Sequence, residues 1–243
     1  MHRFFTNPEN IESEIITITG QDAYHIARSL RMAVGDGLTV SDNTGNTYEC
    51  VLEKIRDDEC VCRIVKKSVS ESEPTVKVTL YMAYPKGDKL EVVIQKAVEL
   101  GASRIVPFES SRCIKRPKAD KLDKQMPRLA RIAQEAAKQC GRDRLPEVDA
   151  PLSFSDMLKD AVQNDLILFC YEDEDKKTIK DVLESTLPSS IAVIVGCEGG
   201  FSPEEAKLAR EAGCISVSLG KRILRCETAP AYVLSAISYR YEL

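Results

Sequence analysis

A buried strand that runs directly into a glycine-rich turn constrains this chain more than any other feature. Residues 191–195 (IAVIV) are apolar and mostly β-branched, as in a strand covered on both faces. Three of the next five residues, 196–200 (GCEGG), are glycines, so the backbone can adopt positive φ and approach a ligand closely. Residues 202–205 (SPEE) supply an N-cap, a first-turn proline and a capping-box glutamate, which predict a helix. Ligands bind at such carboxyl ends of parallel strands.

From residue 75 onward, predicted strands alternate with predicted helices. Strands are expected at residues 76–84, 104–108, 166–170, 191–195 and 214–219. Helices are expected after Asp88, with Glu91 completing a capping box, at 127–140 from Pro127, after Ser153, at 178–184, at 203–212, and at 229–241 with Thr228 as the cap. This alternation is typical of an α/β fold, a mostly parallel sheet with helices on both faces.

The first seventy residues have a different, β-rich pattern. Short strands are expected near residues 15–18, 38–40, 48–52 and 60–65, with a hairpin turn at 42–46. One short helix is expected at 22–32, where Tyr24 and His25 are interpreted as packing residues, with stacking on RNA as the alternative. Short strands separated by glycine turns favour a small barrel. Because residues 68–74 read as a linker, the chain is divided into domains 1–70 and 75–243.

Cysteine and histidine usage limits the chemistry. The 243 residues include nine cysteines without a Cys-x-x-Cys pair and only two histidines, so we expect reduced thiols, a cytoplasmic protein and no metal site. No apolar run reaches the roughly 20 residues of a membrane span, and no signal peptide is recognised.

Charge is unevenly distributed along the chain. The net charge is −4, yet residues 112–144 contain eleven Lys/Arg and four acidic residues. Such a block is typical either of a phosphate-binding surface or of a solvated helix face.

Several common catalytic patterns are absent from the sequence. The turn Gly-x-x-Gly-Gly matches neither the dinucleotide fingerprint nor the P-loop. His2 and His25 both lie in the first domain, so a Ser-His-Asp triad in the second domain has no base. Three predicted strand ends remain, at residues 170–172, 196–200 and 219–225. Their backbone groups suit the edges of adenine and a ribose.

The two segments GCEGGFS (196–202) and LGKRILRCETA (219–229) closely resemble the bacterial 16S ribosomal RNA uridine-N3 methyltransferases of the SPOUT superfamily. The resemblance extends over the whole chain, through RFF (3–5), KGDK (86–89), QKAVELG (95–101) and EAAKQCGR (135–142). Two positions depart from the family pattern: Cys197 replaces an expected proline and Cys226 an expected threonine.

This resemblance implies a fold, a cofactor and a reaction. The first domain would be a PUA-like RNA-binding barrel, and the second a SPOUT methyltransferase domain with a C-terminal trefoil knot. The protein would be a homodimer that uses S-adenosylmethionine, without a metal, to methylate uridine N3 in the 16S rRNA of the 30S subunit. The expected cofactor-binding residues are Cys170, Tyr171, Glu172, Val195, Gly196, Gly199, Gly200, Leu219, Gly220, Ile223 and Leu224.

Uracil N3 must lose its proton as the methyl group arrives. Arg225 is expected to stabilise charge on the base, or alternatively to pair with a glutamate. Glu198 or Glu227 would accept the proton or orient the base, with helix capping as the alternative for Glu227. The residues expected to contact RNA are Arg3, Lys86, Arg112, Lys115, Arg116, Arg128 and Arg131.

Two other functions remain compatible with the sequence. One is a SPOUT methyltransferase that acts on tRNA or on a ribose oxygen. The other is an RNA-binding ribosome-assembly protein that retains the fold without catalysis, which Cys197 and Cys226 would favour.

Overall fold

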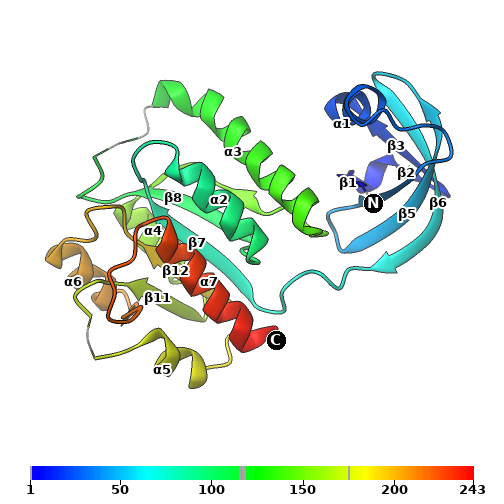
Figure 1. Cartoon of the computed structure of the whole chain (residues 1–243). Helices are drawn as coiled ribbons and strands as arrows, with labels where there is room; N and C mark the ends of the chain where they lie inside the picture. The colour runs from blue at the N-terminus through cyan, green and yellow to red at the C-terminus, as the bar shows by residue number, and fades with distance from the viewer. Residues whose placement is uncertain (1, 115, 117–118, 175) are drawn as a thin grey trace. The chain divides into compact units, whose positions relative to one another are not determined.

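The computed structural model describes residues 2–114, 116, 119–174 and 176–243 (Figure 1). The chain forms two compact units. Unit 1 comprises Met1–Glu73 and Ala137–Leu145, and unit 2 comprises Pro74–Ala136 and Pro146–Leu243. The short segment 137–145 therefore belongs with unit 1, although it falls within the predicted domain 75–243.

Unit 1 is built on a six-stranded sheet in the order β1-β4-β5-β6-β3-β2. Its strands are β1 (His2–Phe5), β2 (Ile11–Glu12), β3 (Ile15–Thr19), β4 (Gly37–Ser41), β5 (Asn46–Ile55) and β6 (Glu59–Val69). β4 and β5 pair antiparallel around the turn at 42–45, which confirms the predicted hairpin. Within the described residues this order runs from β1 at one edge of the sheet to β2 at the other.

The helical segment of unit 1 differs from the prediction. It consists of α1 (Gly20–Tyr24) followed by the π-helical segment η2 (His25–Ser29), and a 3-10 turn, η1 (Pro8–Asn10), precedes it. Ala23 and Ile26 pack into the core at 0% exposure, whereas Tyr24 is 55% exposed. The interpretation of Tyr24 as a packing residue was therefore wrong, because the inward-facing side begins one residue earlier.

A buried carboxylate explains why segment 137–145 belongs to unit 1. Asp143 is 4% exposed and accepts hydrogen bonds from Ser41 at 2.8 Å and Thr47 at 2.6 Å. Arg3 forms an ion pair with the same carboxylate. A buried charge is tolerated only when it is paired and hydrogen-bonded, so this network fixes the segment to the sheet.

Unit 2 is built on a seven-stranded sheet whose strand pairs are all parallel. The main order is β10-β8-β7-β12-β11-β13, with β9 paired to β8. Its strands are β7 (Lys77–Ala83), β8 (Arg104–Glu109), β9 (Glu147–Val148), β10 (Leu152–Ser153), β11 (Leu166–Cys170), β12 (Ser190–Val195) and β13 (Ile215–Val217). The central strand β12 is almost fully buried, as its apolar sequence predicts.

Helices flank this sheet, which confirms the predicted α/β class (Figure 1). They are α2 (Lys89–Glu99), α3 (Ala119–Cys140), α4 (Phe154–Ala161), α5 (Ile179–Glu184), α6 (Pro203–Glu211) and α7 (Thr228–Tyr241). α2 and α7 pack side by side, and α7 also contacts β12. α4 packs against β8, and α6 contacts β13.

The predicted helix starts were only partly right. Ser153, Thr178 and Ser202 cap their helices through their side chains, as expected. Asp88 and Thr228 do not: Asp88 makes no side-chain capping bond, and Thr228 is already the first residue of α7.

The predicted start of α3 at Pro127 is also wrong, because this helix begins at Ala119 and contains Pro127. The buried face of Leu129, Ala133 and Ala136 anchors the helix beyond the proline. Burial of this face stabilises the helix by more than the missing backbone N–H of Pro127 destabilises it.

Candidate functional site

The glycine turn, residues 196–200, is anchored to the core by the aromatic residue that follows it. Phe201 is 1% exposed. Its ring centroid lies 4.3 Å from that of Phe169 and 6.3 Å from that of Phe108. These rings come from β11 and β8, so the turn is fixed against two neighbouring strands of the sheet.

The start of α6 provides a second anchor. Ser202 accepts a hydrogen bond from Glu205 N, and the Glu205 carboxylate accepts one from Ser202 N at 2.9 Å. Glu205 is only 6% exposed and also accepts bonds from Ser111 N at 2.7 Å and Ser111 Oγ at 2.9 Å. One buried carboxylate therefore ties the loop after β8 to the helix that follows the glycine turn.

Gly200 must be glycine for two reasons. Its φ is +63°, a conformation that L side chains rarely adopt. A Cβ atom there would lie 1.7 Å from Glu172 Oε1, so a larger residue would also displace the Glu172 carboxylate. Arg112 completes this contact region, because its Nη1 donates to Gly199 O at 2.9 Å and lies 3.9 Å from Glu172 Oε1.

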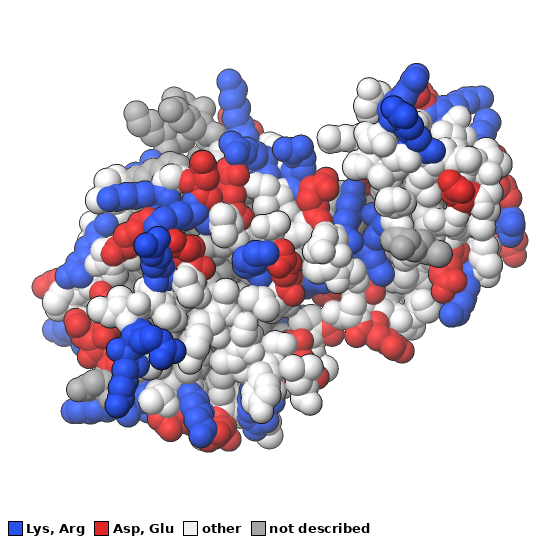
Figure 2. Space-filling view, in the orientation of Figure 1, with Lys and Arg blue, Asp and Glu red and all other residues white. Residues whose placement is uncertain are grey.

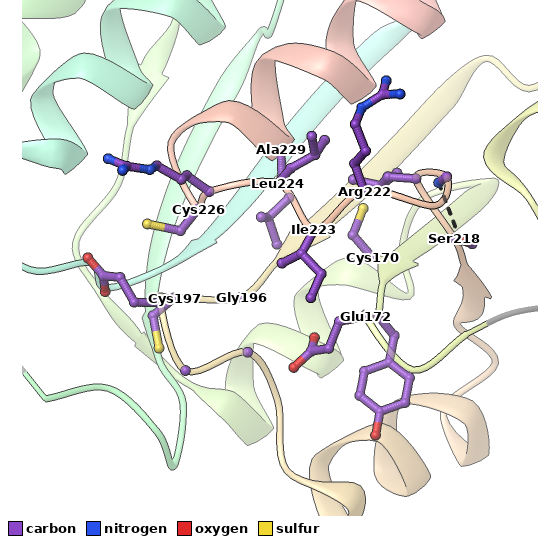
Figure 3. Close-up of a pocket in the computed structure, with 18 of the residues that line it drawn as sticks. Cys170, Glu172, Gly196, Cys197, Ser218, Arg222, Ile223, Leu224, Cys226 and Ala229 are labelled. Atoms are coloured by element: carbon purple, nitrogen blue, oxygen red, sulfur yellow. Dashed lines mark hydrogen bonds between the residues drawn. The ribbon is translucent and has the colours of Figure 1, made fainter.

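A cavity of about 620 Å³ opens between three strand ends of unit 2 (Figure 3). All eleven residues that were expected to bind the cofactor line it, together with Arg225 and Glu198. The further lining residues are Lys89, Cys197, Ser218, Lys221, Arg222, Cys226 and Ala229. The structure thus brings together segments 170–172, 195–200 and 218–226 around one space.

The exposed loop, residues 219–226, forms the opposite wall. Ile223 is 93% exposed, and its side chain projects into the space between the glycine turn and Glu172 (Figure 3). The neighbouring Arg222 side chain points away from that space (Figure 3). A large apolar side chain exposed in a cavity is suited to pack against an apolar or aromatic ligand surface.

Lys89, Glu198 and Glu227 form a charged cluster at one side of the cavity. Lys89 Nζ lies 3.0 Å from Glu198 Oε1 and 3.2 Å from Glu227 Oε2. The backbone N–H of Lys86 also donates to the Glu198 carboxylate at 3.2 Å. Glu227 does not use its side chain to cap α7, so the capping interpretation is wrong. Lys89 was not among the predicted site residues, although it belongs to the KGDK segment (86–89) that carries part of the family resemblance.

Arg225 lies beside this cluster and is only weakly restrained. Its side chain is 84% exposed, and its Nη1 lies 4.0 Å from Glu227 Oε1, the limit of an ion pair. Both interpretations made from the sequence therefore remain compatible with its position: a weak pairing with Glu227 and a contact with an incoming substrate.

The pKa directions follow from these contacts. Burial acts to raise the pKa values of Glu198 and Glu227, but backbone N–H groups and the Lys89 ammonium hold both below the usual value. Hydrogen bonds to Glu198 and Glu227 in turn raise the pKa of Lys89. At neutral pH the cluster therefore consists of two carboxylates bridged by one ammonium.

Comparisons with known proteins assign this arrangement to a family. A family model described as an RNA methyltransferase domain matches residues 71–238, and an RNA methyltransferase PUA domain matches residues 18–65. The ribosomal RNA small subunit methyltransferase E of Bacillus subtilis is 35% identical, covering 100% of this chain and 98% of the relative. The chain belongs to the ribosomal RNA small subunit methyltransferase E family. The resemblance noted in the sequence is thus confirmed.

Solved structures of similar proteins agree with this assignment. A methyltransferase from Legionella pneumophila in complex with S-adenosylmethionine has 30% identity and a TM-score of 0.88, and 98% of this chain and 96% of that chain are covered. The methyltransferase E from Neisseria gonorrhoeae, bound to S-adenosylmethionine, has 28% identity and a TM-score of 0.86, with 99% and 98% covered. The present chain is therefore an RNA methyltransferase with an N-terminal PUA-like domain.

The two positions that differ from the expected family pattern are both buried thiols. Cys197 faces the loop after β8, where Ser110 Oγ lies 3.9 Å from its sulfur and 3.5 Å from that of Cys113. A hydrogen bond between the two thiols lowers the pKa of Cys113 and raises that of Cys197. Cys226 faces the charged cluster, with its sulfur 3.8 Å from Lys89 Nζ and 3.2 Å from Glu227 Oε2.

The predicted RNA-binding residues of this methyltransferase fall into different settings. Arg3 pairs with Asp143 and donates to Ser41 at 3.0 Å, which argues against a phosphate contact. Lys86, Arg116 and Arg131 are exposed. Arg128 is 59% exposed but pairs with Glu91 at 2.9 Å. Arg112 contacts the glycine turn, and Lys115 lies outside the described residues.

The basic block at 112–144 is also divided. Lys138 pairs with Asp22 at 2.6 Å and Arg142 with Glu73 at 2.7 Å, both within unit 1. Their side chains are only 13% and 6% exposed. These two cations are therefore structural, and only the part of the block before residue 137 belongs to unit 2.

Two further searches cover only the part of the chain that the structure describes. It contains no group of three or more His, Cys, Asp or Glu residues arranged to hold a metal ion. It also contains no helix long and apolar enough to cross a membrane.

Proposed function

We propose that this protein uses S-adenosylmethionine to methylate N3 of a uridine in the 16S rRNA of the 30S subunit. The observation that carries the proposal is the cavity, because three separate strand ends place the expected cofactor residues around one space of suitable size. Similar proteins whose structures contain S-adenosylmethionine at 28–30% identity support the choice of cofactor. Relatives named for the small-subunit rRNA support the choice of substrate.

The backbone-rich wall of the cavity suits this cofactor. The 196–200 turn and the 219–226 loop offer N–H and C=O groups to adenine, and the Glu172 carboxylate is positioned to accept hydrogen bonds from ribose hydroxyls. When bound, the sulfonium supplies the methyl group. Ile223 would then cover an apolar face of the bound molecule.

The charged cluster is the proposed site of the uracil base. Arg225 would stabilise negative charge on a uracil oxygen, because it is a nearly unrestrained cation at the rim. Glu198 and Glu227 have lowered pKa values, so they are weak bases, and orienting the base is the role that suits them better. If Arg225→Ala kept near-normal turnover on ribosomal substrate, this role would be wrong.

We further propose a homodimer and a C-terminal trefoil knot, as the resemblance implies. α7 follows the cavity loop directly and carries Tyr239, which is 76% exposed, and Tyr232, which is 43% exposed. Exposed aromatic residues of this kind are common in protein interfaces. Light scattering of the purified protein would give the oligomeric state.

Unit 1 and the basic residues of unit 2 are the proposed RNA-binding parts. In Figure 2, basic and acidic side chains are interspersed over the drawn face of unit 2. We therefore expect the RNA to be held by a few positions, Lys86, Arg112, Lys115, Arg116, Arg128 and Arg131. Charge reversal at Arg116 and Arg131 should reduce the slope of log K against log salt. Because the proposed substrate is ribosomal, we also propose a cytoplasmic location.

Methyl transfer to 30S subunits, followed by mass mapping of the methylated nucleoside, tests the proposal. We expect N3-methyluridine in 16S rRNA. Methylated tRNA or a ribose methyl group would instead favour a different RNA substrate. A protein that binds RNA but shows no S-adenosylmethionine binding by calorimetry would be an assembly factor.

A further inference from the structure

Lys89 occupies a position that helix stability does not explain. It is the first residue of α2, where the helix dipole disfavours a cation. Asp88, which precedes it, makes no side-chain capping bond, so the expected local signal for the helix start is not used. The side chain of Lys89 instead reaches the wall of the cavity.

The ammonium group of Lys89 joins three segments that are distant in the sequence. Besides its own helix, it contacts Glu198 of the glycine turn at 3.0 Å and Glu227, which precedes α7, at 3.2 Å. The side chains of all three residues are only partly exposed, at 34%, 29% and 23%. Two carboxylates that approach the same nitrogen lie close together and repel each other unless a cation separates them.

We propose that Lys89 is a positioning residue for methyl transfer, which holds the Glu198 and Glu227 carboxylates side by side so that they can orient the base. This inference rests on the proposed function, because it assumes that the two glutamates orient the base. Lys89 acts through these glutamates, and contact with the substrate is not required. The same ammonium bridges Glu198 of the glycine turn and Glu227, which directly follows the exposed loop.

The surrounding charges make Lys89 the central cation of this cluster. Glu198, Glu227 and the Cys226 thiol face Lys89, and the Cys226 pKa is raised to about 12, so that thiol is neutral. Arg225 reaches only Glu227, at 4.0 Å and with an 84% exposed side chain. Solvent screens such an exposed pair, so Arg225 cannot substitute for Lys89. Removing the Lys89 charge therefore raises the pKa of both glutamates.

The test compares Lys89→Met, Lys89→Arg and the control Lys96→Met. Lys96 lies on the same helix and pairs with Glu99 at 2.8 Å, but it does not line the cavity. We expect Lys89→Met to lower kcat about 100-fold, the cost of a small misplacement at a reacting centre. We expect the Kd for S-adenosylmethionine to change less than about threefold, and Lys89→Arg to restore most of kcat. Lys96→Met should match the unmodified protein.

The pH dependence separates positioning from a general structural role. In Lys89→Met, the acidic limb of the pH profile of kcat should move to higher pH, because two neighbouring carboxylates no longer share a cation. The double variant Lys89→Met/Glu227→Gln should lower kcat little more than either single change, because both changes remove the same ion pair. Carboxyl NMR titration of Glu198 and Glu227 in the cofactor-free protein should show the same upward shift.

Three results would overturn the proposal. They are a kcat of Lys89→Met within about threefold of the unmodified protein, an effect confined to cofactor Kd, and unshifted carboxyl titrations. If circular dichroism showed that Lys89→Met does not fold, the carboxyl titration of the unmodified protein would decide, because the proposal requires both glutamate pKa values to lie below the usual value. If the unmodified protein showed no methyl transfer, the proposed function would be wrong instead. The carboxyl titration would still show whether the Lys89 charge acts on Glu198 and Glu227.

Discussion

The glycine turn and the exposed loop form opposite walls of one cavity but are supported in very different ways. The turn is followed by Phe201, which is buried among aromatic rings, and by a helix start where the Glu205 carboxylate accepts three hydrogen bonds from Ser111 and Ser202. The loop is mostly solvent-exposed, with Ile223 at 93%. Its Gly220 N–H donates only to the Ser218 hydroxyl, at 3.3 Å.

This difference indicates that the two walls contribute to ligand binding in different ways. A wall that is anchored by buried packing is preorganised, so it adds affinity without an ordering cost. A wall with exposed apolar side chains gains its contacts only when a ligand covers them. We therefore expect changes in the turn to affect folding as well as binding, and changes in the loop to affect binding alone.

The largest effect is expected from removing the anchor of the turn. Phe201→Ala leaves a cavity among Phe169, Phe108 and Phe154, and comparable truncations cost about 3–5 kcal/mol of unfolding free energy. Urea unfolding followed by circular dichroism measures this loss. Phe201→Leu, which keeps most of the apolar volume, should recover much of it. A loss below about 1 kcal/mol in Phe201→Ala would contradict the view that the turn is anchored by packing.

Gly200→Ala should have the next largest effect, because it strains the turn itself. The φ of +63° and the contact with Glu172 require a shift of the turn or of the carboxylate. Because a small displacement of binding groups can reduce their effect about 100-fold, we expect calorimetry to show about 100-fold lower affinity for S-adenosylmethionine. Gly213→Ala is the matched control: its φ is +90°, but no atom lies within 4 Å of an added Cβ. Equal affinity losses in both variants would show that backbone strain alone matters.

Local signals explain what the sequence predicted well. Ser202 and Glu205 lie three residues apart, so the capping box can be recognised in a short window and was confirmed. The apolar run of β12 likewise identified the strand at the centre of the sheet. The strand ends that line the cavity follow from this alternation, because parallel strands share one carboxyl edge.

Contacts between distant segments explain what the sequence did not predict. The Lys89–Glu198 and Arg3–Asp143 pairs each depend on the tertiary fold, and no local pattern distinguishes these cations from solvated ones. The same holds for Pro127, where packing of α3 overrides a local start signal. The charge count of the 112–144 block also combined cations that the fold separates, such as Arg142, which is buried against Glu73.

A smaller effect, confined to binding, is expected in the exposed loop. Ile223→Ala removes an apolar side chain that loses contact with water only when a ligand is bound. Burial of that side chain contributes roughly 1–2 kcal/mol to binding, so we expect the variant to bind the cofactor about tenfold more weakly. The unfolding free energy should stay within about 0.5 kcal/mol. Leu208→Ala, at a 50% exposed position of α6 outside the cavity, is the control and should change neither quantity. A drop in stability for Ile223→Ala would mean that the loop is packed in the free protein.

The smallest effect is expected at Cys226, where the exposed loop meets the charged cluster. Burial and a hydrogen bond to Glu227 raise the pKa of this thiol to about 12, so it remains protonated throughout the working pH range. A serine hydroxyl can donate the same hydrogen bond, and Cys226→Ser should therefore keep kcat within about threefold. Because no thiolate forms below pH 10, both proteins should give the same pH profile of kcat between pH 7 and 10. If a basic limb were present in the unmodified protein and lost in Cys226→Ser, the thiol would be ionising, and the loop would be open to water at that position.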